Sequence, residues 1–223
     1  MVKYIGDKNY EHGSKEAVGV LITNLGTPDA PEKKELKVYL NQFLSDPRVI
    51  ELPKILWQIL LKLVILQVRP SKSAEAYKKI WTKNGSPLLD ISKRQLEKIK
   101  SSFSHSHPNM IFEVGMRYGN PSIPNALRNL QKQNVRKLLV LPMYPQYCAA
   151  TTGSTFDEVT NVLQKWRWIP ELRFINQYFE NDKYIEALSN SVSSFWEKHS
   201  KPQKIIFSYH GIPKKYLLNG DPY

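Results

Sequence analysis

Short runs of apolar and β-branched residues recur along the chain, and within each run the apolar character is continuous rather than alternating. Continuous apolarity over a few residues is typical of strands whose two faces are both buried. The pattern therefore predicts five buried strands, at residues 17–23, 110–114, 136–142, 172–176 and 204–209.

The segments between these runs have the length and composition of helices. We expect them at residues 31–44, 72–81, 88–103, 122–133, 154–166 and 182–199. Alternating strands and helices predict parallel pairing through right-handed crossovers, and hence an α/β fold with a doubly wound parallel sheet. Ligands of such sheets bind at the carboxyl ends of the strands, so functional residues are expected in the loops there.

One segment, LPKILWQILLKLVIL at residues 52–66, departs from this alternation because it is almost uniformly apolar. Interrupted by Lys54 and Lys62, it is shorter than the about 20 residues that a membrane-spanning helix needs. One interpretation is a buried helix. The other is an exposed lip that binds a flat hydrophobic ligand or rests on a bilayer, with Trp57 and the lysines at the interface.

Composition narrows the class of protein. With 223 residues and 41% hydrophobic content, the chain is long enough to bury a full-sized core. Cys148 is the single cysteine of the sequence, so no disulfide forms within the chain. The net charge of +12 attracts nucleic acid, anionic lipid or a carboxylate-bearing ligand, and a solvated lysine surface explains it equally well.

The loops after the first two predicted strands carry candidate binding residues. Residues 24–29 form a glycine-containing turn, which is a weak signal for phosphate binding. In the loop at residues 115–121, Arg117 has the chemistry to pair with a carboxylate while Tyr118 lies along an apolar ligand. An ordinary surface turn is the alternative interpretation.

The loops after the third and fifth predicted strands add hydroxyls and an imidazole. Around Gly153 lie hydroxyl residues that suit a helix N-cap and that would either hold an anion or only begin the helix: Thr151, Thr152, Ser154 and Thr155. His210 follows the fifth predicted strand; a lone histidine is more often structural than catalytic, but its place at the mouth of the sheet strengthens the functional interpretation. The chain has no HExxH, CxxC, GxSxG or P-loop pattern.

Six motifs together resemble the ferrochelatase family, in its order and spacing. They are GVLITNLGTPDAP, LNQFLSDPRVIELP, NGSPL, GMRYGNPS, VLPMYPQY followed by TTGST, and FSYHGIPKKYLLNGDPY. The resemblance implies insertion of Fe²⁺ into protoporphyrin IX to form protohaem, on a chelatase-like, three-layer fold of the Rossmann or flavodoxin kind. It also implies that residues 1–177 form the complete N-terminal half of the chelatase fold and that residues 178–223 are the start of its C-terminal half. The bacterial, cytoplasmic branch is the closer match.

The resemblance carries roles to individual residues. It makes His210 the catalytic residue, as an iron ligand or an acceptor of pyrrole protons. It places Arg117 and Tyr118 in the wall of the porphyrin cavity and Leu25 against the face of the macrocycle. Residues 52–66 match the apolar lip over the cavity, which allows peripheral contact with the inner membrane. The other substrate-binding residues that it implies are Arg69 and Ser86, near the propionates, and Tyr144 of the YPQY motif.

The chain departs from the family pattern at two places. Where the eukaryotic branch has a cysteine that binds an iron–sulphur cluster, this chain has Ala149, with Cys148 one place earlier, so we expect no cluster. The family continues beyond GDPY to an acidic residue that faces the histidine, so we expect a C-terminally truncated chain without useful chelatase activity. The alternatives are a porphyrin-binding remnant, a chelatase for a related tetrapyrrole or another divalent metal, and a basic nucleic-acid-binding module. The dispersed lysines argue against nucleic acid as a partner.

Overall fold

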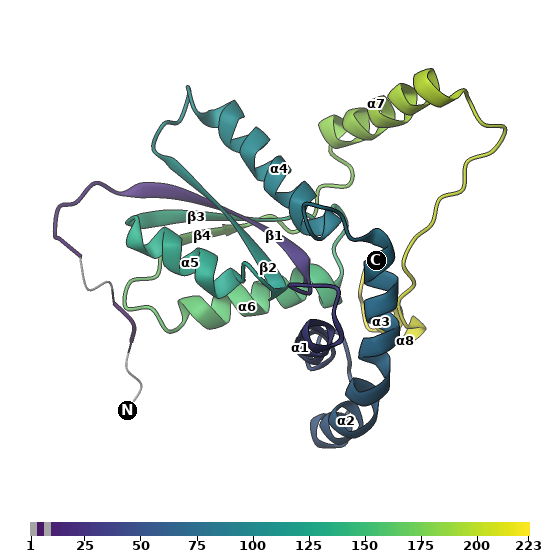
Figure 1. Cartoon of the computed structure of the whole chain (residues 1–223). Helices are drawn as coiled ribbons and strands as arrows, with labels where there is room; N and C mark the ends of the chain where they lie inside the picture. The colour runs from purple at the N-terminus through teal and green to yellow at the C-terminus, as the bar shows by residue number, and fades with distance from the viewer. Residues whose placement is uncertain (1–3, 7–9) are drawn as a thin grey trace.

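The computed structural model describes residues 4–6 and 10–223, which form a parallel sheet with helices on both faces (Figure 1). The four strands of the described chain are β1 (Ala17–Thr27), β2 (Met110–Gly119), β3 (Val135–Pro142) and β4 (Glu171–Phe174). Their order across the sheet is β2-β1-β3-β4, and every neighbouring pair is parallel. The chain moves outward from β1 first to one side and then to the other, so the sheet is doubly wound. The predicted α/β fold class is confirmed.

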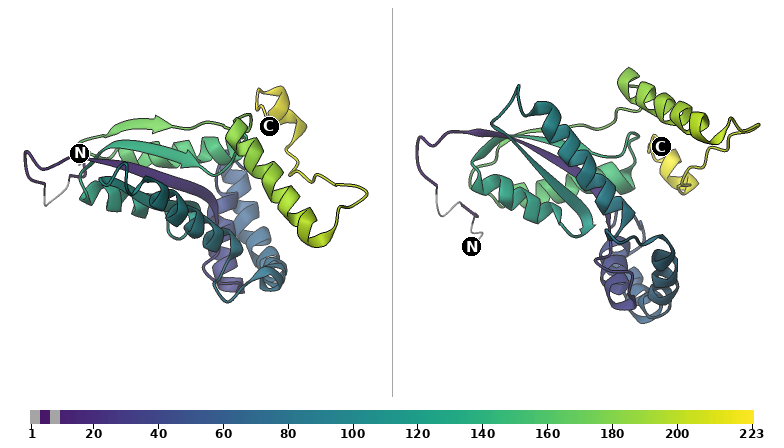
Figure 2. Two further views of the ribbon diagram at one scale, coloured as in Figure 1. Left: turned by 90° about the horizontal axis from the view of Figure 1, so that it is seen from above. Right: turned by 45° about the horizontal axis from the view of Figure 1, so that its top comes forward.

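The helices make two outer layers around the sheet. α4 (Pro87–Phe103) lies on one face, and α5 (Ile123–Lys132) and α6 (Ser154–Leu163) lie on the other (Figure 2). Alternate side chains of β1 point to opposite faces. Leu21 joins the cluster under α5 and α6, whereas Asn24 Nδ2 donates to Ser92 Oγ of α4 over 3.2 Å. Both faces of β1 are covered, which explains its continuous apolar run.

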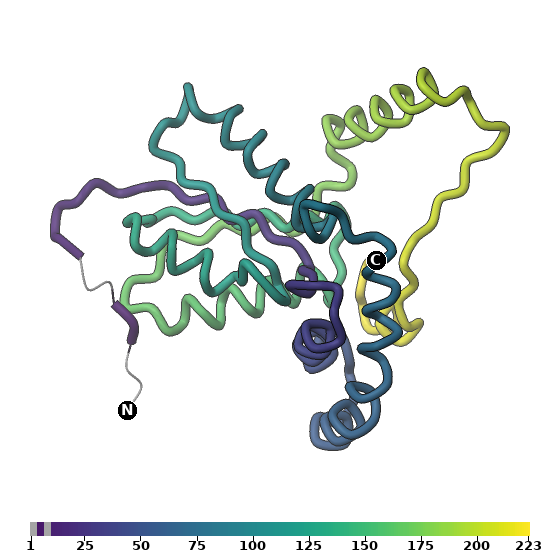
Figure 3. Tube along the Cα trace, viewed as in Figure 1, coloured from purple at the N-terminus to yellow at the C-terminus, as the bar shows by residue number. Residues whose placement is uncertain are grey.

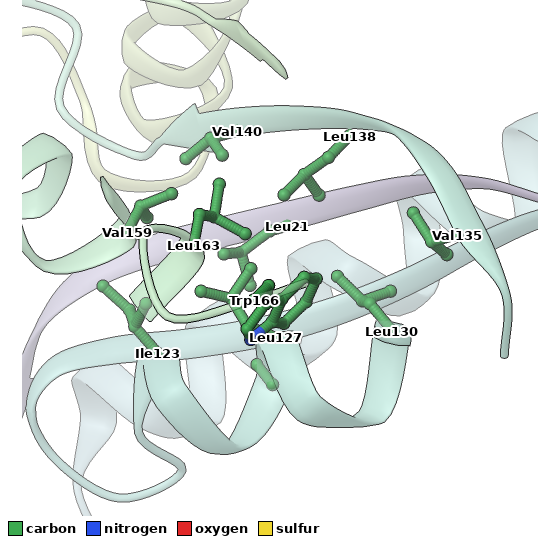
Figure 4. Packing of buried hydrophobic residues seen from close by; sticks show 11 residues of the cluster. Leu21, Ile123, Leu127, Leu130, Val135, Leu138, Val140, Val159, Leu163 and Trp166 are labelled. Atoms are coloured by element: carbon green, nitrogen blue, oxygen red, sulfur yellow. The ribbon is translucent and has the colours of Figure 1, made fainter. Parts of the chain in front are cut away.

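A cluster of buried side chains fills the space between the sheet and the α5–α6 layer (Figure 4). In α5, Ile123, Leu127 and Leu130 recur every three or four residues, so they share the face that meets the sheet. Trp166, just after α6, closes the cluster and is 4% exposed. Burying one leucine side chain contributes about 2 kcal/mol. This layer therefore anchors the sheet whose carboxyl edge carries the candidate site.

Strands β1 and β2 run further than their apolar pattern predicts. Their pairing continues through Gly26 with Tyr118 and Thr27 with Gly119, so most of the two predicted loops is strand. Both glycines have positive φ, +107° and +77°. A Cβ on Gly26 would lie 1.8 Å from the carbonyl oxygen of Tyr118, and one on Gly119 would lie 2.2 Å from that of Thr27. The glycine after the first apolar run therefore serves close strand pairing, and its interpretation as part of a turn is wrong.

A helical arm lies beyond the carboxyl end of β1. It consists of α1 (Lys33–Leu44), α2 (Lys54–Leu60), the π-helical turn η1 (Leu61–Ile65) and α3 (Leu66–Ile80) (Figure 1). α1 packs against α3, and Leu36, Leu40 and Leu61 form a second buried cluster with Tyr118 of β2. The arm is thus fixed to the end of the sheet.

The apolar segment at residues 52–66 is an exposed helical face. Leu61 and Leu66 point inward, but Ile55 is 77% exposed and Leu63 is 71% exposed. The buried-helix interpretation of this segment is therefore wrong.

The last part of the chain leaves the sheet. α7 (Asp182–His199) has no buried residue and projects away from the strands, and the chain then returns to α8 (Lys214–Leu218) (Figure 3). The predicted fifth strand is wrong: residues 204–209 are extended but pair with no described strand, and Ile206 is 91% exposed. Because α7 does not pack on the sheet, it does not bring the chain back beside β4. The domain boundary after residue 177 stays a prediction.

Candidate active site

The buried carboxylate of Asp46, in the connection between α1 and α2, joins three parts of the fold. Its Oδ2 accepts hydrogen bonds from Arg117 Nη2 at 2.6 Å, Tyr118 OH at 2.8 Å and Ser154 Oγ at 2.6 Å. Its Oδ1 accepts from the Arg48 amide at 2.8 Å. The α1–α2 connection, the end of β2 and the start of α6 are therefore held at one point.

Each of the three nitrogens of the Arg117 guanidinium has a partner within the chain. Besides Asp46, its Nε donates to Ser154 Oγ at 2.6 Å, and its Nη1 lies 3.3 Å from Glu158 Oε2. Its Cζ also lies 4.7 Å from the centre of the Tyr118 ring. The carboxylates that Arg117 meets thus belong to the chain itself. The surface-turn interpretation of Arg117 and Tyr118 is wrong, since both lie in β2 and Tyr118 is buried.

The negative charge of Asp46 is balanced by the positive charge of Arg117. Burial alone would raise the pKa of Asp46, but the hydrogen bonds from Ser154, Tyr118 and the Arg48 amide, with the charge of Arg117, hold it below its ordinary value. Burial raises the pKa of Tyr118, so its hydroxyl is a protonated donor at neutral pH. An ionised carboxylate and a guanidinium therefore face each other below the surface of the site.

The hydroxyl-rich segment before α6 does not cap that helix. A π-helical turn, η2 (Ala149–Gly153), runs directly into α6, and no side chain caps the start of α6. Ser154 Oγ contacts Asp46 and Arg117 instead. The N-cap prediction for this segment is therefore wrong, and the anion beside Ser154 is the chain's own Asp46.

His210 lines an open pocket of about 550 Å³, in the size range of small-molecule sites. The pocket lies between the last part of the chain and the loops that follow β3 and β4, and the other residues of its wall are Gln146, Tyr147, Gln177, Phe179, Tyr209, Gly211, Ile212, Pro222 and Tyr223. His210 thus faces loops at the carboxyl edge of the sheet, although no sheet strand leads to it. Within the described ranges, no group of three or more His, Cys, Asp and Glu residues is placed to hold a metal ion.

Two residues, Tyr216 and Asp221, hold the segment that follows His210 against the rest of the chain. Tyr216 OH donates to the Val49 carbonyl oxygen at 3.3 Å and accepts from the Glu51 amide at 3.4 Å. Asp221 is 8% exposed, and its Oδ2 accepts from the Ala149 amide at 2.8 Å. The histidine is therefore held near the sheet by residues that follow it in the sequence.

The other candidate residues lie at several places around the carboxyl edge. Leu25 is half-buried against the cluster that contains Tyr118. Ser86 is buried at the start of α4, whereas Arg69 is exposed on α3. Tyr144 follows β3, and burial raises the pKa of its hydroxyl. The structure thus brings Leu25, Arg117 and Tyr118 together.

His210 and the Arg117–Tyr118 pair line different hollows. A hollow of about 360 Å³ is lined by Arg117 and Tyr118, together with Gln42 and Glu158. It shares no lining residue with the His210 pocket among the residues that the structure describes. The candidate site therefore has two parts, which are linked through the loops around Asp46.

Sequence reasoning missed Asp46, Tyr216 and Asp221. All three stand in quoted motifs, FLSDPRV and KKYLLNGDPY, but none lies in the loop directly after a predicted strand. Asp46 and Asp221 in polar loops, and Tyr216 in the short helix α8, carry no signal of burial. Their spacing within motifs was the only available hint.

Comparison with known proteins decides the family. The ferrochelatase family model matches residues 17–223. The chain belongs to the ferrochelatase family. It is 57% identical over 222 residues to a ferrochelatase of Hydrogenovibrio crunogenus, covering 96% of this chain and 58% of that protein. It is 49% identical to a ferrochelatase of Thioalkalivibrio sulfidiphilus, covering 100% of this chain and 60% of the relative.

A further relative is ferrochelatase 2 of Shewanella oneidensis, which is 50% identical over 212 residues and of which 65% is covered. The chain thus spans about 60% of the length of the ferrochelatases that it matches. In the part of the chain that the structure describes, no helix has both the length and the apolarity to cross a membrane.

Proposed function

We propose that this chain serves ferrochelatase chemistry, the insertion of Fe²⁺ into protoporphyrin IX to form protohaem. Family membership carries this proposal, because the family match covers residues 17–223 and includes the His210 motif. The pocket that His210 lines supports it. Three tyrosines and a phenylalanine in the wall of that pocket offer flat apolar surfaces to a planar tetrapyrrole.

The reaction requires removal of two protons. Fe²⁺ replaces the two pyrrole N–H protons of protoporphyrin, so the products are protohaem and two protons, with no change of oxidation state. A neutral imidazole is suited to accept such a proton, or to bind Fe²⁺ as it loses water. His210 is exposed in its pocket and is the residue to which we assign this role.

The remaining candidates are of two kinds: residues that form the wall of the site, and residues that contact the propionates of the porphyrin. Leu25 and Tyr118 supply packed apolar surface, and Tyr144 adds a half-buried ring after β3. We assign to Arg69, which is exposed, and to Ser86 the contact with propionates. Since Arg117 is paired internally, we propose that it stiffens the wall rather than binding a propionate. We expect no iron–sulphur cluster.

We also propose that the exposed face of α2 and η1 touches a membrane surface from the cytoplasmic side. Ile55, Ile59 and Leu63 form an apolar patch there, with Lys54 and Lys62 at its border. Such a face suits the boundary between acyl chains and anionic headgroups. Co-sedimentation with vesicles rich in phosphatidylglycerol should fall on Leu63→Asp, and equal binding of variant and wild type would refute the contact.

The test follows porphyrin and iron separately. Protoporphyrin IX is titrated into the purified chain under anaerobic conditions while the Soret band is recorded, and Fe²⁺ is then added. The 223-residue chain should shift the Soret band but form little haem, since it spans about 60% of the length of the ferrochelatases that it matches. In the same chain completed to the length of these relatives, the wild type should form haem, and His210→Ala should keep the Soret shift but form haem roughly 100-fold or more slowly.

Two results would contradict the proposal: no Soret shift with the wild type, or equal haem formation by wild type and His210→Ala. A Soret shift without insertion of any metal would instead identify a porphyrin-binding protein. Faster insertion of another divalent metal than of Fe²⁺ would identify a different chelatase.

A further inference from the structure

The segment that follows His210 touches the rest of the molecule on two separate loops. Tyr216 contacts the loop between α1 and α2, at Val49 and Glu51, and Lys215 Nζ lies 3.8 Å from Glu51 Oε2. Asp221 contacts the loop after β3, at the Ala149 amide. The position of His210 therefore depends on how these two loops lie relative to each other.

Asp46 joins the two loops. Its carbonyl oxygen accepts from the amides of Val49 and Ile50, both at 3.0 Å, which shapes the loop that Tyr216 meets. Its side chain accepts from Ser154 Oγ at 2.6 Å. Ser154 directly follows η2, whose first residue is Ala149. One buried carboxylate therefore ties the Tyr216 contact to the Asp221 contact.

A second brace between the same elements is more exposed. Arg48 donates to Asp157 from two nitrogens, Nε to Oδ2 at 2.7 Å and Nη2 to Oδ1 at 3.0 Å, so this pair too links the α1–α2 loop to α6. The two side chains are 42% and 37% exposed, and water and salt screen such a pair. The Asp46 carboxylate is 3% exposed, so its hydrogen bonds are not screened in this way.

We propose that Asp46 is a positioning residue for His210: it fixes the two loops on which Tyr216 and Asp221 dock the histidine-bearing segment. The assignment rests on the proposed role of His210 in the reaction. Asp46 lines neither the His210 pocket nor the Arg117–Tyr118 hollow, so it acts through the docking contacts rather than on the substrate.

The test compares amide hydrogen exchange in Asp46→Asn and wild type, without porphyrin or metal. The Asn side chain keeps the size of Asp46 but loses the charge that attracts Arg117. The Ala149 amide, which donates to Asp221, and the Glu51 amide, which donates to Tyr216, should exchange roughly tenfold or more faster. Asp221→Asn is the direct positive control for the Ala149 amide. Glu171→Gln, an exposed pair with Arg173 at the start of β4, is the matched negative control.

A second readout separates positioning from local loosening of the loops. Tyr147 and Tyr223 line the same pocket as His210, so their rings should shift the C2–H proton resonance of His210. In Asp46→Asn it should move toward the position of a histidine free in solution, while protected amides of β1 and β3 stay protected. In Glu171→Gln it should not move.

Unchanged protection at Ala149 and Glu51 in a folded Asp46→Asn variant would overturn the proposal, as would an unmoved His210 resonance. If Asp46→Asn does not fold, Ser154→Ala removes one of the three donors to Asp46 Oδ2 and should give the same changes at smaller size; no change there would overturn it. Because neither porphyrin nor iron is present, this result stands or falls separately from the proposed chelatase function.

Discussion

The carboxyl edge of the sheet and the segment after residue 177 have similar apolar patterns in sequence but different structures. At the edge, Leu25 and Tyr118 pack into a cluster, and Asp46 accepts hydrogen bonds from both Tyr118 and Arg117. After residue 177, α7 buries none of its side chains and Phe207 is 74% exposed. An apolar run becomes a buried strand only when a neighbour supplies both hydrogen bonds and a packing surface.

This difference divides the candidate site into a rigid wall and a docked segment. The wall consists of side chains that hydrogen bonds hold in one arrangement. His210 belongs to the docked segment, which is held by the hydrogen bonds of Tyr216 and Asp221. The contacts indicate that the wall contributes more to the free energy of unfolding than the docked segment does.

Loss of an apolar side chain should lower the free energy of unfolding much more in the buried core than in the projecting helix α7. Leu127→Ala removes a fully buried residue of α5 and should lower the free energy of unfolding by about 3 kcal/mol. Phe195→Ala, on α7, removes a side chain that is 58% exposed and should change it by less than about 0.5 kcal/mol. Urea unfolding followed by circular dichroism measures both, and similar losses would mean that α7 packs on the core.

Removing the charge of Asp46 should produce the next largest effect. Asp46→Asn leaves Arg117 with a weaker partner in a buried site, which should cost about 2 to 4 kcal/mol of unfolding free energy. Glu171→Gln, at an exposed ion pair, should cost less than about 0.5 kcal/mol. The same urea experiment compares them, and equal values would show that the buried network adds no stability.

Acid should remove part of this stability from the wild type alone. The folded-state pKa of Asp46 lies below its ordinary value of 3.8, so the unfolded state takes up the proton first as the pH falls. The contribution of Asp46 is therefore complete well above pH 3.8 and is lost as the pH falls through the folded-state pKa. Between pH 6 and pH 3 the stability difference between wild type and Asp46→Asn should shrink, and a constant difference would contradict the assigned pKa direction.

Much of the fold follows from the sequence, because burial on both faces leaves a readable mark. The four sheet strands and the six predicted helices are all present near their expected places. The ends of β1 and β2 were missed because Gly26 and Tyr118 extend the pairing through close backbone approach, which apolarity does not signal. Residues 204–209 have the composition of a strand, but composition does not show whether a neighbouring strand is available.

The candidate site was only partly predictable for a related reason. His210, Arg117 and Tyr118 are visible as chemical groups next to apolar runs. Their environment depends on Asp46, which is about 70 residues before Arg117 in sequence and meets it only in the folded chain. A carboxylate in a DPR loop looks solvated until the packing that buries it is known. Contacts that join distant loops therefore need coordinates.

If the proposed function is right, protoporphyrin binds beside the imidazole of His210. Nuclear magnetic resonance tests it most directly, by recording the His210 C2–H signal as protoporphyrin IX is added to the chain. A macrocycle next to His210 should shift this signal through its ring current, while the signals of the distant His105 and His107 should stay in place. A Soret shift with an unmoved His210 signal would place the porphyrin elsewhere and contradict the claim.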